Sequence, residues 1–224
     1  MDFRTLREEV WRANRALPAL GLVVMHSGNA SGIDRERGLV LIKPSGVDYE
    51  TLRPEDLAVV TLDGRPATAD QVPDGIETSL RPSVDTRHHL ALYREDPSVG
   101  GVVHTHSNYA TAWAAVGRPI PCALTAMADE FGGEIPCAPY ADNEGDHIGE
   151  AILAARTRAP AVLLAGHGVF AFDASPMEAV KAAAMVEDAA KTLAIAAGLG
   201  DPPPLPPSEI ETWWARYHET YGQR

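Results

Sequence analysis

The chain has 224 residues, of which 45% are hydrophobic and 22% charged, the balance of a globular protein with a substantial core. Its formal net charge of −12 excludes a broad surface for nucleic acid or anionic lipid, so any phosphate site must be small and local. No apolar run is long enough to cross a membrane, and the N-terminus lacks the apolar segment of a signal peptide, so we expect a cytoplasmic protein. The two cysteines, Cys122 and Cys137, are too few for a disulfide framework, and we expect buried free thiols.

The first predicted element is an amphipathic helix that begins near Phe3 and stops at Pro18, because apolar residues recur every three or four positions. A loop rich in small polar residues is expected at 27–32. Two short apolar runs, 39–42 and 57–62, predict buried strands. After a proline-containing loop, Ser83 is placed to cap a helix that runs to about residue 96.

The second half of the chain alternates further strands and helices. Central strands are predicted at 99–106, 161–165 and 169–172, with a helix near 108–116 and a mixed, proline-containing stretch between the first two strands. Ser175 to Glu178 form a capping box that opens a helix to about residue 198. The proline-rich segment 200–207 is an extended connector to a C-terminal helical arm, 208–224, with a second capping box at Ser208 to Glu211. These patterns predict one α/β domain over residues 1–224, ending in this arm.

Two histidines, His104 and His106, end the predicted central strand. Because side chains alternate faces along a strand, both imidazoles point to the same side. His167 lies between two glycines just after another strand, where the backbone can turn tightly and leave room for a ligand. Histidines at strand ends are often only hydrogen-bonded polar residues, but three of them with one open position are typical of a catalytic zinc site. The remaining histidines, which we expect at the surface or behind the site, are His26, His88, His89, His147 and His218.

A phosphate site is predicted after the strand at 39–42. The segment Lys43–Gly46 offers a lysine, a hydroxyl and a flexible glycine amide, although Pro-Ser-Gly is also an ordinary turn. Asn29 with Ser31, and Ser83 at a predicted helix N-terminus, provide further hydrogen-bond donors.

Five motifs, in this order and spacing, resemble the class II aldolase/adducin superfamily over nearly the whole chain. They are Ser27-Gly28-Asn29-Ala30-Ser31, Ile42-Lys43-Pro44-Ser45-Gly46-Val47-Asp48-Tyr49, Pro82-Ser83-Val84-Asp85-Thr86, Val103-His104-Thr105-His106-Ser107 and Gly166-His167-Gly168-Val169-Phe170. Within the superfamily, the sequence is most similar to the L-ribulose-5-phosphate 4-epimerases. The resemblance implies a single-domain, three-layer α/β/α fold with a central, mostly antiparallel sheet.

The resemblance also implies the members of the active site. A divalent metal, zinc or another such as Mn2+ or Co2+, would be held by Asp85, His104, His106 and His167. The sugar phosphate would be bound, mainly through its phosphate, by Asn29, Lys43, Ser45, Gly46 and Ser83. Asp129 and Tyr221 match catalytic acid/base residues that act on a neighbouring subunit's site in a fourfold-symmetric homotetramer. One departure is Val84, which replaces a phosphate-binding serine and leaves Arg81 or Arg87 as alternative contacts.

The reaction implied is the interconversion of L-ribulose 5-phosphate and D-xylulose 5-phosphate, a step of arabinose catabolism. A base removes the 4-hydroxyl proton, the C3–C4 bond breaks beside the metal-bound carbonyl, and the aldehyde fragment rotates before it is attacked on its other face. Asp129 and Tyr221 would exchange protons on opposite faces. The alternative is an aldolase of the fuculose-1-phosphate type, which releases the aldehyde. Those aldolases carry glutamate where this chain has Asp85, and this difference favours the epimerase.

A third interpretation is a non-catalytic, adducin-like assembly domain. Loss of the metal-binding histidines would indicate such a domain, but the chain retains all three. We therefore rank this interpretation last.

Overall fold

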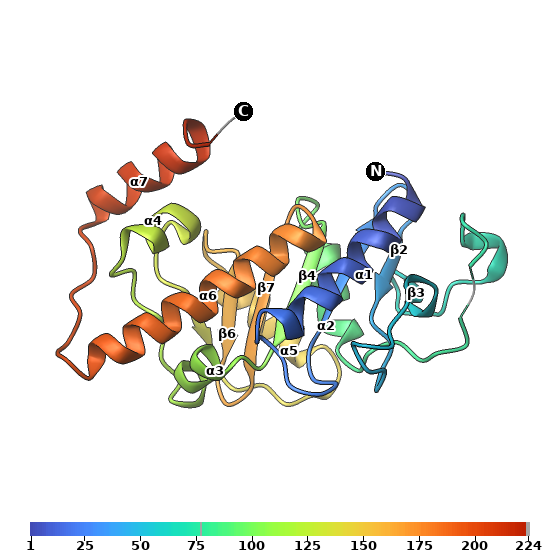
Figure 1. The fold of residues 1–224 in the computed structure, drawn as a ribbon, viewed down its shortest axis with the longest axis horizontal. Coiled ribbons are helices and arrows are strands. Elements are labelled where there is room, and N and C mark those ends of the chain that lie inside the picture. Colours follow the sequence, from blue (N-terminus) through green and yellow to red (C-terminus); the bar gives the residue numbers. More distant parts are fainter. Residues whose placement is uncertain (77, 223–224) are drawn as a thin grey trace.

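The structure, a computed structural model, describes residues 1–76 and 78–222. Seven strands form one sheet: β1 (Asn29–Asp34), β2 (Leu39–Ile42), β3 (Ala58–Thr61), β4 (Gly101–Thr105), β5 (Cys137–Ala138), β6 (Ala161–Leu164) and β7 (Gly168–Asp173). Their order is β3-β2-β1-β4-β7-β6-β5 (Figure 1). All neighbours pair antiparallel except β5 and β6, which confirms the expected mostly antiparallel sheet.

Helices cover both faces of this sheet and make the three layers that the resemblance implied. One face carries α1 (Phe3–Ala19), α3 (Asn108–Ala115), α4 (Thr125–Phe131) and α6 (Pro176–Ala197). The other face carries α2 (Thr86–Glu95) and α5 (His147–Ala155). The last helix, α7 (Pro207–Glu219), packs against α4 after the extended connector (Figure 1). None of the helices formed by the described residues is long and apolar enough to cross a membrane.

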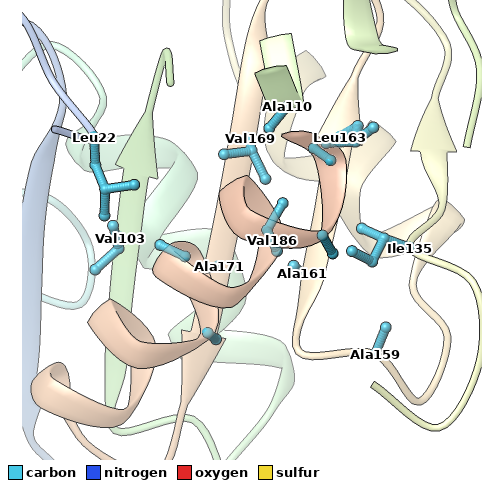
Figure 2. Packing of buried hydrophobic residues seen from close by; sticks show 14 of the residues in the cluster. Leu22, Val103, Ala110, Ile135, Ala159, Ala161, Leu163, Val169, Ala171 and Val186 are labelled. Carbon is cyan, nitrogen blue, oxygen red and sulfur yellow. The ribbon is translucent and has the colours of Figure 1, made fainter. Parts of the chain in front are cut away.

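The period-two alternation of the central strands divides the core between these faces. On β4, Val103 is buried against the α1/α6 side, whereas its neighbour Val102 is buried against α2 and α5. On β7, Ala171 is buried on the α1/α6 side, whereas Phe170 is buried against α2 and α5. Figure 2 shows Val103 and Ala171 beside the α6 side chain Val186 in the first of these clusters. Because the central strands are buried on both faces, only their ends are open to substrate.

The structure corrects several expected boundaries. Pro18 lies inside α1, which continues to Ala19. The small polar segment expected as a loop forms β1 from Asn29 onward, and α2 is capped at Asp85 rather than at Ser83. The capping box expected at Ser208 is absent, because α7 already begins at Pro207. The remaining predicted strands and helices agree to within about two residues, and the mixed stretch contains α4, β5 and α5, which were not predicted.

The C-terminal arm and the cysteines follow the sequence expectations in part. Residues 200–206 form the extended connector and α7 forms the arm, whose last two residues, 223–224, lie outside the described residues. Both cysteines are free, and Cys122 is buried whereas Cys137 is half-buried.

Candidate active site

Three histidines meet at the end of β4. Because β4 and β7 are antiparallel neighbours, His106, just past the end of β4, lies beside His167, just before β7. One potential ligand atom from each of these residues and one from His104 all lie within 4.8 Å of one another. A Cβ added to Gly168 would approach the His106 ring to 2.7 Å, so glycine is needed here to make room for the imidazole. The predicted histidine cluster is therefore present.

His104 is held rigidly in the middle of this cluster. Its Nδ1 lies 2.9 Å from the carbonyl oxygen of Val169, which can only accept, so Nδ1 carries the proton and Nε2 keeps a free lone pair. Phe170 stacks on the ring at a centroid distance of 4.2 Å and an interplanar angle of 16°. Burial lowers the pKa of His104 to about 3, which keeps the imidazole neutral and ready to act as a ligand.

The cluster fits a divalent transition metal. Burial also lowers the pKa values of His106 and His167, so all three imidazoles are neutral donors near pH 7. His104 is buried, whereas His106 is exposed and His167 is half-buried, which leaves one side of the cluster open to solvent. Three ligands with an open side are typical of a catalytic metal site rather than a structural one.

Asp85 lies beside the cluster but is not one of its three members. Its Oδ2 accepts a hydrogen bond of 2.7 Å from the Asn29 amide and one of 3.3 Å from the Ser83 hydroxyl. Burial would raise the pKa of Asp85, but its polar surroundings, among them the hydrogen bond from the Asn29 amide, bring it below its ordinary value. Asp85 is therefore an ionised carboxylate next to the three histidines.

Lys43 provides a buried cation in the same region. Its Nζ lies 4.6 Å from the centroid of the Tyr49 ring and 3.4 Å from the Pro44 carbonyl oxygen. Among the described residues, no carboxylate lies within ion-pairing distance of this ammonium group, and burial lowers its pKa. The segment that follows β2 pairs with the residues just before α2, since the backbone N of Ser83 donates a hydrogen bond of 3.1 Å to the carbonyl oxygen of Lys43. This pairing brings the two predicted phosphate-binding segments side by side.

One cavity of about 270 Å³ joins these groups. Its lining includes all of the predicted metal and substrate residues named above: Asn29, Lys43, Ser45, Gly46, Ser83, Asp85, His104, His106 and His167. Val84 also lines it, whereas neither Arg81 nor Arg87 does, so the suggested arginine contacts are not observed. The lining also contains His26 and Asn143, which no sequence motif assigned to the site.

Asp129 and Tyr221 do not line the cavity of their own chain. Asp129 is half-buried on α4, and Tyr221 follows α7, which packs on α4 at the other end of the chain's long axis from β3 (Figure 1). Tyr221 is exposed and stacks on Tyr217 at a centroid distance of 5.1 Å. Within one chain, therefore, both residues belong to the α4/α7 end of the molecule and neither reaches the cavity of the histidines.

The comparisons with known proteins agree with this fold. Residues 8–194 match the family described as Class II Aldolase and Adducin N-terminal domain. The chain therefore belongs to the class II aldolase/adducin family.

Its relatives of similar sequence include enzymes that share one described activity. The L-ribulose-5-phosphate 4-epimerase UlaF of Salmonella paratyphi C is 44% identical over 205 residues, which cover 87% of this chain and 86% of the relative. The protein of the same description from Salmonella typhi is 43% identical over the same shares.

Solved structures show the same fold at lower identity. An L-fuculose 1-phosphate aldolase superposes with a TM-score of 0.85 at 26% identity, covering 97% of this chain and 98% of the other. YgbL of Klebsiella pneumoniae, described as a putative aldolase/epimerase/decarboxylase, superposes with a TM-score of 0.81 at 26% identity, covering 95% and 99%.

Proposed function

We propose that this chain is a metal-dependent L-ribulose-5-phosphate 4-epimerase, which interconverts L-ribulose 5-phosphate and D-xylulose 5-phosphate. The observation that carries the proposal is one cavity that holds both a neutral three-histidine cluster and a buried lysine with no carboxylate partner among the described residues. Such a cavity suits a small molecule with a metal-chelating carbonyl and an anionic group. The relatives described as epimerases, 44% identical over most of the chain, support the choice of reaction.

The phosphate of the substrate is bound by the segments that meet at the Lys43 end of the cavity. Lys43 supplies the positive charge, and its low exposure makes that charge strong because little water screens it. Ser45 and Ser83 supply hydroxyl donors, and Gly46, at a φ of +70°, lets the backbone approach an anion closely. Asn29, which donates to Asp85, fixes the carboxylate between the phosphate end and the histidines.

Zinc, or a similar divalent ion, would be held by the imidazole nitrogens of His104, His106 and His167, with the Asp85 carboxylate as a fourth ligand or a neighbour of the ion. When bound, the metal supplies a Lewis acid that stabilises the negative charge left on the ketose oxygens as the C3–C4 bond breaks. The carbonyl of Val169 and the ring of Phe170 orient His104 for this role, so that its Nε2 does not reorganise when the metal binds.

The acid and base that invert C4 come from a neighbouring subunit. Asp129 and Tyr221 lie away from the cavity of their own chain, as expected for residues that complete another chain's site. In a fourfold-symmetric tetramer, the α4/α7 end of one subunit would close the cavity of the next. Inversion requires a proton-transfer group on each face of the aldehyde, one to remove the 4-hydroxyl proton and one to return a proton after re-addition, and a carboxylate with a phenol provides such a pair.

An aldolase remains the alternative, because it breaks the equivalent bond with the same metal site. The TM-score of 0.85 with an L-fuculose 1-phosphate aldolase favours this candidate at the level of the backbone. Asp85 favours the epimerase, because its shorter side chain is held by Asn29 and Ser83 and is not free to act as the mobile base that glutamate provides in those aldolases.

The test is to incubate the zinc-loaded protein with L-ribulose 5-phosphate and to follow the formation of D-xylulose 5-phosphate. We expect conversion without release of free aldehyde, and we expect chelation to abolish it until a divalent metal is restored. His104→Ala should bind less than one ion per subunit and should be inactive. Stoichiometric release of an aldehyde fragment would identify the aldolase instead, and catalysis that survives complete metal removal would refute the metal mechanism.

A further inference from the structure

The connection between β5 and α5, residues 139–146, brings one amide side chain to the rim of the active-site cavity. Asn143 lines the cavity together with the three histidines, and no other residue of this connection does so. The surrounding residues, 142–147, are all exposed. An exposed loop that places a single polar side chain at the metal site needs contacts that hold it there.

The loop is fastened on both sides of this amide. Asp142 Oδ1 lies 2.7 Å from His147 Nδ1 and accepts a hydrogen bond of 3.0 Å from the backbone N of Glu144. The Arg87 guanidinium of α2 donates to the carbonyl oxygen of Gly145 over 2.9 Å. These contacts restrain the backbone before and after Asn143, so its side chain is pre-organised without substrate.

The side chain of Asn143 is itself oriented by His88, which is fully buried on α2. His88 Nε2 lies 2.9 Å from Asn143 Oδ1, so the imidazole donates and the amide oxygen accepts. The other ring nitrogen of His88 is buried and has no partner within residues 1–76 and 78–222. Within the described residues, Asn143 is therefore the only side-chain hydrogen-bond partner of the His88 ring, and its Nδ2 keeps both hydrogens for the cavity.

We propose that Asn143 determines substrate specificity by donating a hydrogen bond from Nδ2 to a neutral oxygen, a hydroxyl or the aldehyde oxygen, of the bound sugar phosphate. His88 is the positioning residue that orients the amide. A neutral oxygen suits this position, because Asp142, Glu144 and Asp146 flank Asn143 in the sequence and make the loop acidic, whereas the buried Lys43 ammonium lies at the other segment of the cavity lining. This inference rests on the proposed function.

The experiment compares steady-state kinetics of the metal-loaded wild type with two variants at Asn143. Asn143→Leu removes every polar atom of the side chain but keeps its branched shape, whereas Asn143→Asp keeps the acceptor for His88 and removes the donor. Each should raise KM for L-ribulose 5-phosphate roughly threefold to tenfold, the usual loss for one neutral hydrogen bond. The inhibition constant of inorganic phosphate should not change for Asn143→Leu, because phosphate binds at the Lys43 end.

The positioning role of His88 is tested by asking whether the effect of its substitution on KM depends on Asn143. His88→Phe keeps the aromatic ring but cannot donate, so KM should rise when Asn143 is present. In the Asn143→Leu background the same change should add nothing to KM, a non-additivity that a general loss of packing would not produce. Glu95→Gln, an exposed change at the end of α2 that does not line the cavity, is the control and should behave as wild type.

The epimerase function and the role of Asn143 can be refuted separately. A wild-type protein without epimerase activity would overturn the proposed function and this inference with it. Active wild type with unchanged KM in both Asn143 variants would overturn the role of Asn143 alone. Weakened phosphate inhibition in Asn143→Leu would also overturn it, by showing that the amide serves the phosphate. Additive effects of His88→Phe and Asn143→Leu would remove His88 as the positioning residue.

Discussion

A chain of buried polar side chains lies directly behind the histidine cluster. Ser31 Oγ lies 2.7 Å from His89 Nδ1 and 2.7 Å from the Tyr93 hydroxyl, which joins β1 to α2 across the layer interface. His89 is fully buried, and its ring meets Phe170 edge-on at 5.9 Å, the same ring that stacks on His104. His88 and His89, two of the histidines expected at the surface or behind the site, thus lie behind it.

This burial predicts a loss of stability in mild acid. Burial lowers the pKa of His89 to about 3 in the folded protein from an ordinary 6.5, so between these values only the unfolded chain binds the proton. The free energy of unfolding should therefore be independent of this group above pH 6.5 and should fall as the pH drops below it. Urea denaturation of metal-free protein from about pH 7.5 to pH 4.5 measures the effect. His89→Gln should reduce the slope, and an unchanged slope would exclude His89 as its source.

At the scale of the elements, the long excursion between β3 and α2 is fixed to α1 by a buried ion pair. Arg7 Nε and Nη2 lie 2.6 and 3.1 Å from the two carboxylate oxygens of Asp74, and both side chains are almost completely buried. Arg7 also donates to the carbonyl oxygens of Pro54 and Ile76. Because this excursion leads into Ser83, the pair holds in place the segment that borders the phosphate end of the cavity.

Breaking this pair should destabilise the protein strongly. Arg7→Met leaves the Asp74 carboxylate buried without its partner, which costs about 3–5 kcal/mol in comparable sites. The double variant Arg7→Met/Asp74→Leu removes both charges and should be more stable than Arg7→Met alone. Urea unfolding of the two variants and of wild type makes the comparison. A double variant at least as unstable as the single one would contradict the assignment of the cost to the unpaired charge.

The sequence did not predict β1, because its residue types are determined by contacts with other elements rather than by the local preferences of a strand. β1 contains small polar residues typical of a loop, but a Cβ on Gly32 would lie 2.7–2.9 Å from side chains of α1 and α6, so packing of two helices onto the strand requires glycine there. Strands such as β2 and β6 were predicted because burial on both faces requires continuous apolar runs. The histidine pair at the end of β4 was likewise predictable, since the two-residue period of a strand is a local property.

At the scale of the whole molecule, some residues of the site can be identified only from the folded chain and not from sequence motifs. His26 and Asn143 reach the cavity only through the three-dimensional course of their loops, and neither belongs to a pattern. Asp129 and Tyr221 were named only through the resemblance, and the single chain does not bring them to the histidines. Near the cavity, Val84 on its lining and Met25, next to the lining residue His26, are largely exposed apolar side chains, as expected where another subunit covers a surface.

Assembly of the site from two chains predicts complementation between inactive variants. Tyr221→Phe should lower turnover by roughly 10²–10⁴ with little effect on binding, because the ring and its packing remain. His104→Ala should be inactive through loss of the metal. Unfolding and refolding the two variants together gives hybrid tetramers in which a subunit with intact histidines adjoins one with an intact Tyr221. About one quarter of the sites in an equal random mixture would be complete, so activity should recover to about that fraction of wild type.

Mixing His104→Ala with His106→Ala is the matched control, since both defects lie in the same histidine cluster and no hybrid can restore it. If the Tyr221→Phe and His104→Ala mixture also stays inactive while hybrid tetramers are demonstrably present, all catalytic groups come from one chain and the shared site is refuted.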